Sequence, residues 1–128
     1  MAKMRQRWRA ITYKPKAEAV RDGLCRQTIR KGEFAVGDIQ PFHGWEGLPY
    51  RSPWSWRREF VLIEVVPILA APTYFAIGGA PRRYDWRGSY ADELARLDYI
   101  DPPTGAALRD VLMGFHGRGK HELSILRW

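Results

Sequence analysis

The chain has 128 residues, of which 45% are hydrophobic and 27% are charged, and this is the composition of one folded domain. Its longest apolar run, 60–71, is interrupted by Glu64 and Pro67, so the sequence predicts no membrane span and no membrane partner. The basic N-terminus has no apolar stretch behind it, as a secretory signal would. One cysteine excludes a disulfide framework, and three scattered histidines predict no metal site. We expect a cytoplasmic protein without a cofactor.

The charge is strongly basic. Twenty-one Lys and Arg face fourteen Asp and Glu, which gives a net charge of +7, and sixteen of the basic residues are arginines. Arginine suits bidentate contacts with phosphate and stacking on bases. Surplus positive charge also favours nucleic-acid partners through release of counterions. An arginine-rich genome would give the same count, and the oligomeric state and a cellular or phage origin are left open.

The N-terminal part is expected to be a basic arm over residues 1–9, followed by a single domain over 10–128. A run of β-branched and aromatic residues predicts a short strand over 9–13. A proline suited to a first helical turn then predicts a helix over 15–21, with an apolar stripe that extends to Leu24. The glycine at 23 can end this helix with a positive φ.

A strand is predicted over residues 25–30, and its side chains alternate between two faces. One face carries Arg26, Thr28 and Arg30, and Cys25 lies on the other. A face made of guanidinium, hydroxyl and guanidinium indicates a ligand that is anionic or rich in hydrogen-bond acceptors. We therefore take this strand as the working surface of the protein.

The rest of the chain interleaves strands and helices. The continuous apolar run over 60–66 suits a central strand, and a long loop over 46–58 precedes it. The other expected elements are strands over 39–45, 73–77 and 122–128, a helix over 89–97, and a helix over 102–113 capped by Asp101. This order predicts the α+β class, as a small mixed β-barrel of five to six strands with two to three flanking helices.

The loop over 46–58 is rich in large aromatic residues, which argues against disorder. Its rings alternate with arginines, a pattern typical of surfaces that stack single-stranded or flipped bases. A hydrophobic cluster that pins the loop is the alternative. The residues expected to contact a base or a phosphate are Lys14, Arg26, Arg30, His43, Trp45, Tyr50, Trp54 and Arg57.

Several short motifs occur in a fixed order along residues 10–128. They are Ile11-Thr-Tyr13, Asp22-Gly23, Thr28-Ile-Arg30, Val36-Gly-Asp38 and the helical segment 95–101 before the last helix. In this order they resemble the ASCH superfamily of small PUA-like β-barrels. The similarity extends to bacterial N4-acetylcytidine amidohydrolases and to stand-alone phage and prokaryotic members. The segments 46–58 and 78–90 look like additions to the minimal pattern.

The resemblance implies a cleft beside the strand over 25–30 that binds RNA or a modified nucleobase. In the amidohydrolase branch, a lysine, a threonine and a glutamate carry the reaction. Thr28 matches the threonine, and Asp98 stands where the glutamate would, one methylene shorter. The lysine position holds Cys25, and a neutral thiol cannot activate a hydroxyl as an amine does. Lys14 is a candidate to supply the amine from across the cleft.

Two functions are therefore open. The first is binding of RNA, single-stranded nucleic acid or a modified nucleobase, and the alternative is hydrolysis of an N4-acylated cytidine by Thr28 and Asp98. Metal-independent RNA cleavage ranks third. Cys25 is either a thiol whose pKa the neighbouring arginines lower, with His43 or His116 as its base, or a small buried core residue. Asp98 is either an acid or base in the cleft or a solvated carboxylate at a helix end.

Overall fold

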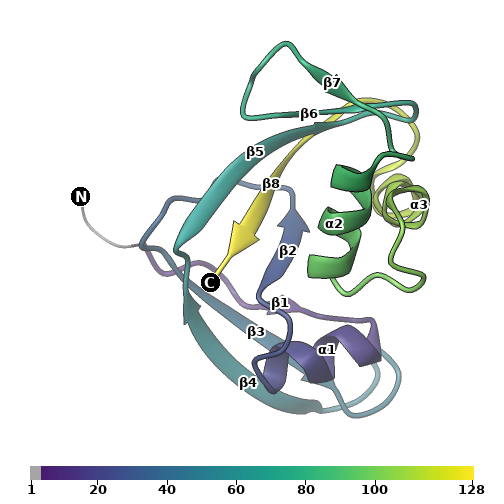
Figure 1. Ribbon diagram of the computed structural model, residues 1–128. Coiled ribbons are helices and arrows are strands. Elements are labelled where there is room, and N and C mark those ends of the chain that lie inside the picture. The colour runs from purple at the N-terminus through teal and green to yellow at the C-terminus, as the bar shows by residue number, and fades with distance from the viewer. Residues whose placement is uncertain (1–3) are drawn as a thin grey trace.

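Two β-sheets and three helices build the protein, as a computed structural model over residues 4–128 describes it (Figure 1). The smaller sheet has the order β1-β3-β4, from strands β1 (Arg9–Ala10), β3 (Ile39–Trp45) and β4 (Trp54–Val61). The larger has the order β2-β8-β5-β6-β7, from β2 (Gln27–Arg30), β8 (His121–Arg127), β5 (Glu64–Ala70), β6 (Phe75–Ile77) and β7 (Arg83–Tyr84). The helices are α1 (Lys14–Arg21), α2 (Ser89–Leu97) and α3 (Gly105–His116).

Each sheet has its own hydrophobic core. Helix α1 packs on β3 and β4, where its alanines and Val20 meet Ile11 and Phe42. Helices α2 and α3 pack on each other and against the larger sheet, around the buried ring of Trp86. The indole Nε1 of Trp86 donates to the carbonyl oxygen of Ala71 at 2.8 Å, so this large side chain is buried with its polar atom satisfied. The two cores approach each other at residues 25–30, since Cys25 belongs to the core of the smaller sheet and Ile29 to that of the larger.

Most of the expected elements are confirmed, and the strands predicted over 25–30, 73–77 and 122–128 correspond to β2, β6 and β8. Helix α2 and strand β3 have the bounds that the sequence predicts, and α1 begins one residue earlier than expected. Gly23 ends α1 with a φ of 80°, as expected of a glycine after a helix. Leu24 does not continue the apolar stripe, because the chain has left the helix and this side chain is exposed. The β7 strand lies in a segment for which no strand was predicted.

The expectation of one strand over 60–66 is wrong. The chain breaks at Leu62 and Ile63 and passes from the smaller sheet to the larger one. The Leu62 N–H still donates to the Asp38 carbonyl oxygen at 2.9 Å, on the side of the smaller sheet, whereas the Ile63 N–H donates to the Arg127 carbonyl oxygen at 2.9 Å, so the change of partner falls between these two residues. The aromatic loop is also shorter than predicted, because β4 begins at Trp54. Strand β5 does lie in the interior of its sheet.

The start of α3 also differs from the prediction. Thr104, and not Asp101, caps the helix, since its hydroxyl accepts from the Ala107 N–H at 3.2 Å. The strand predicted over 9–13 is reduced to the two residues of β1. Part of the predicted basic arm, residues 1–3, lies outside the described residues. Within its remainder, the Gln6 N–H donates to the Ile39 carbonyl oxygen at 2.8 Å, so this segment runs along β3.

The α+β class is confirmed, and residues 4–128 contain three helices, as expected, but eight strands rather than five to six, because several of the strands are only two or three residues long. Both β1 and β2 are edge strands, and the hydrogen-bonded ladders between residues 4 and 128 form two separate sheets. The Arg30 side chain links these edges, since its Nη2 donates to the Ala10 carbonyl oxygen at 3.0 Å. The seam between β1 and β2 is therefore held by a side chain rather than by a backbone ladder.

Close packing at the start of α3 gives a stability prediction. A Cβ atom added at Gly105 would overlap the Trp86 carbonyl oxygen and the Ala91 side chain, whereas Gly114 of the same helix has open space. We expect Gly105→Ala to lower the free energy of unfolding by roughly 1–3 kcal/mol or more. Gly114→Ala, the matched control, should raise it by about 0.5–1 kcal/mol. Denaturant unfolding followed by circular dichroism measures both, and equal effects of the two substitutions would contradict the packing described.

Candidate functional site

A lysine, a threonine and an aspartate from three different elements meet where the two cores join. The Lys16 ammonium donates to Thr28 Oγ1 at 3.0 Å and to Asp98 Oδ2 at 2.8 Å. Lys16 comes from α1, Thr28 from β2, and Asp98 is the C-cap residue of α2. These residues are 8%, 2% and 4% exposed. We call Lys16, Thr28 and Asp98 the triad.

Local structure explains how each member reaches this point. Lys16 lies three and four positions before Ala19 and Val20 on the buried face of α1, so its long stem runs inward. Asp98 follows the last turn of α2, where its N–H still donates to Leu94. The Gln27 amide donates to the same Leu94 carbonyl oxygen at 3.1 Å, which ties β2 to the end of α2.

A second cation contacts the threonine. Arg30 Nε lies 3.3 Å from Thr28 Oγ1, on the side of the hydroxyl that faces β1. A hydroxyl has two acceptor lone pairs and one proton, so acceptance from Lys16 and Arg30 leaves the Thr28 proton for a further acceptor. Two positive charges at one hydroxyl also stabilise negative charge that develops on its oxygen.

The electrostatics of Asp98 are set by its burial. Removal from water raises the pKa of the Asp98 carboxyl, and the Lys16 ammonium, then the nearby Gln27 amide and Arg30, oppose this shift. Its Oδ1 atom is buried and has no hydrogen-bond partner among the residues that the structure describes. A buried carboxylate at a helix end excludes the solvated-carboxylate interpretation of Asp98. Its free oxygen is an acceptor for a ligand or a water molecule.

Cys25 lies in the core beneath α1. Its thiol is fully buried and lies 3.3 Å from the Gln27 carbonyl oxygen. Burial raises the pKa of the Cys25 thiol, which is the opposite of the activation by arginine considered above. The His43 ring packs against Trp54 instead. Cys25 thus has the placement of a small buried core residue and not of a nucleophile with a histidine base.

The lysine of the triad was missed from the sequence. The resemblance pointed to position 25, and Lys14 was the expected substitute, but Lys14 is exposed and the amine comes from Lys16. One local signal was available, because Lys16 shares the helix face of the buried Ala19 and Val20. A lysine on an apolar face needs a buried partner, and Asp98 is 82 positions away in the chain.

The other predicted residues fall in different places. The Arg26 side chain is exposed and reaches only the Gly23 carbonyl oxygen, at 3.4 Å, so it does not join the triad. The aromatic rings gather on the smaller sheet, where the His43 and Trp54 rings stack with centroids 3.6 Å apart and Arg57 lies 4.9 Å from the Trp54 centroid. We call the following set the outer aromatic cluster: Trp8, His43, Trp45, Tyr50 and Trp54.

Two surface hollows lie near α1. One, of about 290 Å³, lies between the Lys14 side of α1 and Trp45, and the other, of about 280 Å³, lies between Arg26 and Trp128. Neither contains a member of the triad. Within residues 4–128, no three His, Cys, Asp or Glu side chains gather as metal ligands would.

Comparison of the chain with protein-family profiles, with curated proteins and with solved structures found no match. The geometry of the triad and of the outer aromatic cluster is therefore the basis for the function argued below.

The buried ion pair makes a prediction for Lys16. In Lys16→Met the Asp98 carboxylate loses its partner, and we expect the free energy of unfolding at pH 7 to fall by about 3–5 kcal/mol. An unpaired, buried Asp98 has a raised pKa, so its protonated form fits the fold better. The loss should therefore shrink as the pH falls toward 4. Lys14→Met, an exposed lysine of the same helix, is the control and should change stability little. Equal losses in both variants, measured by urea unfolding, would rule out the pair as the cause.

Titration of His43 is expected to lower the stability of the protein as the pH falls, whereas the loss in Lys16→Met shrinks as the pH falls. Burial lowers the pKa of His43 from its ordinary 6.5, and the nearby Arg57 adds to this shift. The unfolded chain thus binds more protons than the folded one below pH 6.5, so stability falls as the pH drops, by at most about 1.4 kcal/mol per pH unit for one group. In His43→Phe, which keeps a ring against Trp54, the fall between pH 7 and 5.5 should be smaller than in the wild type. Parallel curves for the two proteins would show that His43 does not titrate in this way.

Proposed function

We propose that the chain is a PUA-like member of the ASCH superfamily that hydrolyses the amide of an acylated base amine, with N4-acylated cytidine as the substrate class. One observation supports this most: the Lys16 amine lies 3.0 Å from the Thr28 hydroxyl and 2.8 Å from the Asp98 carboxylate. The sequence offered a threonine and a carboxylate but no amine beside them. Lys16 supplies that missing group from α1.

In the first step, Lys16 becomes a neutral amine that can act as a general base. Burial raises the pKa of the Asp98 carboxyl, so this carboxylate is the group that can take up a proton from its partner. A proton passes from Lys16 Nζ to Asp98 Oδ2. The neutral Lys16 amine then accepts the hydroxyl proton of Thr28.

The second step transfers the acyl group. Thr28 Oγ1 attacks the acyl carbonyl carbon and forms a C–O bond, and Arg30 stabilises the resulting oxyanion. The C–N bond to the base breaks, and the departing amine takes a proton from the Lys16 ammonium. A water molecule then attacks the threonine ester, which releases the acyl group as a carboxylic acid and restores the Thr28 hydroxyl.

Substrate entry needs the seam between β1 and β2. Thr28 is 2% exposed, and Arg30 bridges the two edge strands through its bond to the Ala10 carbonyl oxygen. Release of that bond would open the side of Thr28 that faces β1. The closed PUA-like barrel expected from the resemblance would then correspond to the two sheets with β1 and β2 side by side.

The same site also supports binding of a modified nucleobase without hydrolysis. The free Oδ1 of Asp98 is an acceptor for an exocyclic amine, and the triad cations offer donors to a base carbonyl. In a site that binds without hydrolysis, these contacts would hold the base, and Thr28 would act only as a hydrogen-bond partner. The cytoplasmic location expected from the sequence remains a prediction for either function.

Incubation with N4-acetylcytidine, followed by chromatography of cytidine, tests the proposal. We expect turnover by the wild type, partial activity in Thr28→Ser, and a loss of about 10³-fold or more in Thr28→Ala. Cys25→Ala is the matched control from the strand end, and should keep turnover because its thiol takes no part.

Three results would count against this assignment. Turnover that survives Thr28→Ala would remove the nucleophile. An absence of cytidine, together with a rise in melting temperature when N4-acetylcytidine is added, would favour binding without hydrolysis. If neither turnover nor a melting shift is seen, both functions of the site are contradicted.

A further inference from the structure

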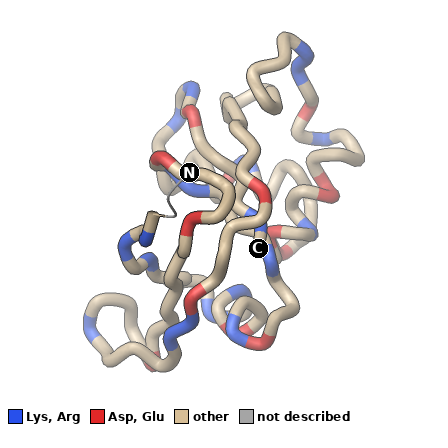
Figure 2. The backbone as a smooth tube through the Cα atoms, turned by 90° about the vertical axis from the view of Figure 1, so that its left-hand side faces the viewer, with Lys and Arg blue, Asp and Glu red and all other residues tan. Residues whose placement is uncertain are grey.

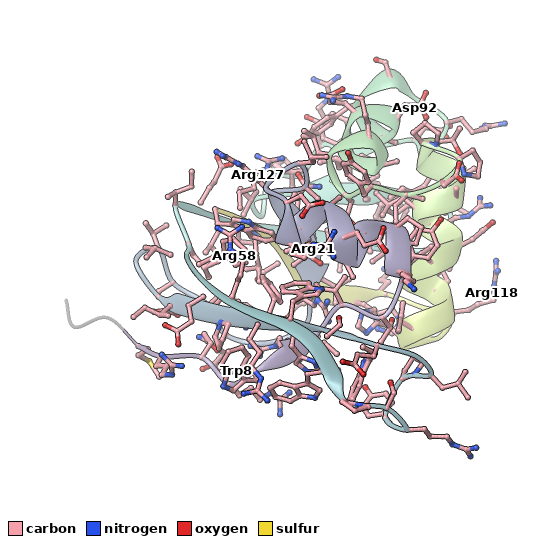
Figure 3. All side chains as sticks on the ribbon, turned by 90° about the horizontal axis from the view of Figure 1, so that it is seen from below. Trp8, Arg21, Arg58, Asp92, Arg118 and Arg127 are labelled. Carbon is pink, nitrogen blue, oxygen red and sulfur yellow. The ribbon has the colours of Figure 1, made fainter. Side chains whose placement is uncertain are left out.

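The smaller sheet has a second face that the triad does not use. Alternation along β3 and β4 directs Phe42, Trp56 and Phe60 toward the core beneath α1. His43 belongs to the opposite face, and the register shift after Gly44 brings Trp54 to that face too, where its ring stacks on His43. Figure 3 shows Trp8 on the side of the sheet away from α1. The outer aromatic cluster therefore lies on the solvent side of this sheet.

The cluster is organised around stacked rings. The Trp54 ring stacks on buried His43 with an interplanar angle of 13°, and the Trp8 centroid lies 5.5 Å from that of Trp54. Trp45 meets the His43 ring edge-on at 4.9 Å. Tyr50, whose centroid is 5.1 Å from that of Trp45, is 81% exposed. The buried His43 ring thus holds Trp54 and Trp45 in place, and Tyr50, which contacts Trp45, presents most of its surface to solvent.

Positive charge accompanies these rings. Arg57 lies over Trp54, and the exposed Arg51 follows Tyr50 in the turn before β4. Neither of these two arginines takes part in an ion pair between described residues, whereas Glu59 of the same sheet is paired with Arg5. Lys and Arg occur in all parts of the fold (Figure 2), so charge alone does not single out this face. What distinguishes this face is that its arginines occur together with exposed aromatic rings.

We infer that this outer face binds single-stranded nucleic acid. Bases stack on Tyr50, Trp45 and Trp8, and the phosphates pair with Arg51 and Arg57. Aromatic rings stack any unpaired base, whereas bases in a duplex have no free ring faces. The net charge of +7 favours a polyanion over an acidic peptide, which would offer the rings no planar partner. This inference holds whether or not the triad is catalytic.

The face adjoins the triad through β1. Ala10 pairs with His43 of the cluster on one side, and its carbonyl oxygen accepts from Arg30 on the other. A strand held on the outer face would thus pass the seam that leads to Thr28. A nucleotide within a single strand is therefore the form in which a base would reach the site.

Fluorescence anisotropy of labelled oligonucleotides tests the inference. The probes are twelve-nucleotide oligouridylate and oligothymidylate, which carry no acyl amide, and a twelve-base-pair duplex, each at two salt concentrations. We expect micromolar or tighter binding of a single strand that weakens with salt. Tyr50→Ala should raise Kd about fivefold or more, and Tyr50→Phe, which keeps the ring, should not. Arg57→Ala should weaken binding and reduce the salt slope by about 0.7.

The matched control is Arg83→Ala, which removes an arginine 4.2 Å from the Tyr74 ring centroid on the larger sheet and should leave Kd unchanged. Absence of binding at low salt, equal or tighter binding of the duplex, or equal effects of Arg57→Ala and Arg83→Ala would each overturn the inference. A preference for oligouridylate or for oligothymidylate shows whether the bound strand is RNA or DNA, and either preference supports the inference. Because the probes cannot be deacylated, failure here is distinct from failure of the hydrolysis assay.

Discussion

The contact between Lys16 and Asp98 is the constraint on which the rest of the structure depends. Removing an ammonium and a carboxylate from water is costly, and only a close pairing offsets most of that cost. The two partners come from helices on different sheets, α1 on the smaller and α2 on the larger. Their pairing therefore sets how the two halves of the fold sit against each other, and it places Thr28 between them.

Strand β2 transmits this constraint to the surrounding elements. Its four residues contact almost every layer: Gln27 reaches α2 and Arg127, Thr28 reaches α1, Ile29 enters the larger core, and Arg30 reaches β1. A short strand with a polar face is unusual when that face is turned to water. Here Thr28 and Arg30 of that face lie at the junction of the two cores, whereas Arg26 precedes the strand and is exposed.

Local patterns in the sequence predicted the elements that local physics determines. The helix over 89–97 and the strand over 39–45 follow from periodicity, and the end of α1 follows from a glycine. The break after Leu62 was not predictable in this way, since it depends on partners far away in the chain: the Leu62 N–H bonds to Asp38 and the Ile63 N–H bonds to Arg127. The cap of α3 was misplaced because Asp101 and Thr104 both suit an N-cap position, and sequence alone does not choose between them.

In the candidate site, too, some residues could be found from the sequence and one could not. Thr28, Arg30 and Asp98 were found from their residue types and order, and the structure brings them around one point. Lys16 was missed because the resemblance directed attention to position 25, while the face it shares with Ala19 and Val20 was the physical signal. A helix face that is apolar except for one lysine indicates a buried partner, and a search for an unpaired acidic residue near a helix end would have suggested Asp98.

Burial of the triad and access to it are linked through Arg30. Its guanidinium contacts the Thr28 hydroxyl and also holds the Ala10 carbonyl oxygen across the seam. Opening the seam therefore costs one charge-assisted bond, but it leaves the cation beside Thr28, free to contact whatever enters. A carbonyl oxygen of a substrate that replaces the Ala10 oxygen would receive the same donor. In the closed site, Arg30 donates to the Ala10 carbonyl oxygen, and with a bound amide it would donate to the carbonyl oxygen of the substrate. Closure of the site and positioning of the substrate therefore depend on the same residue.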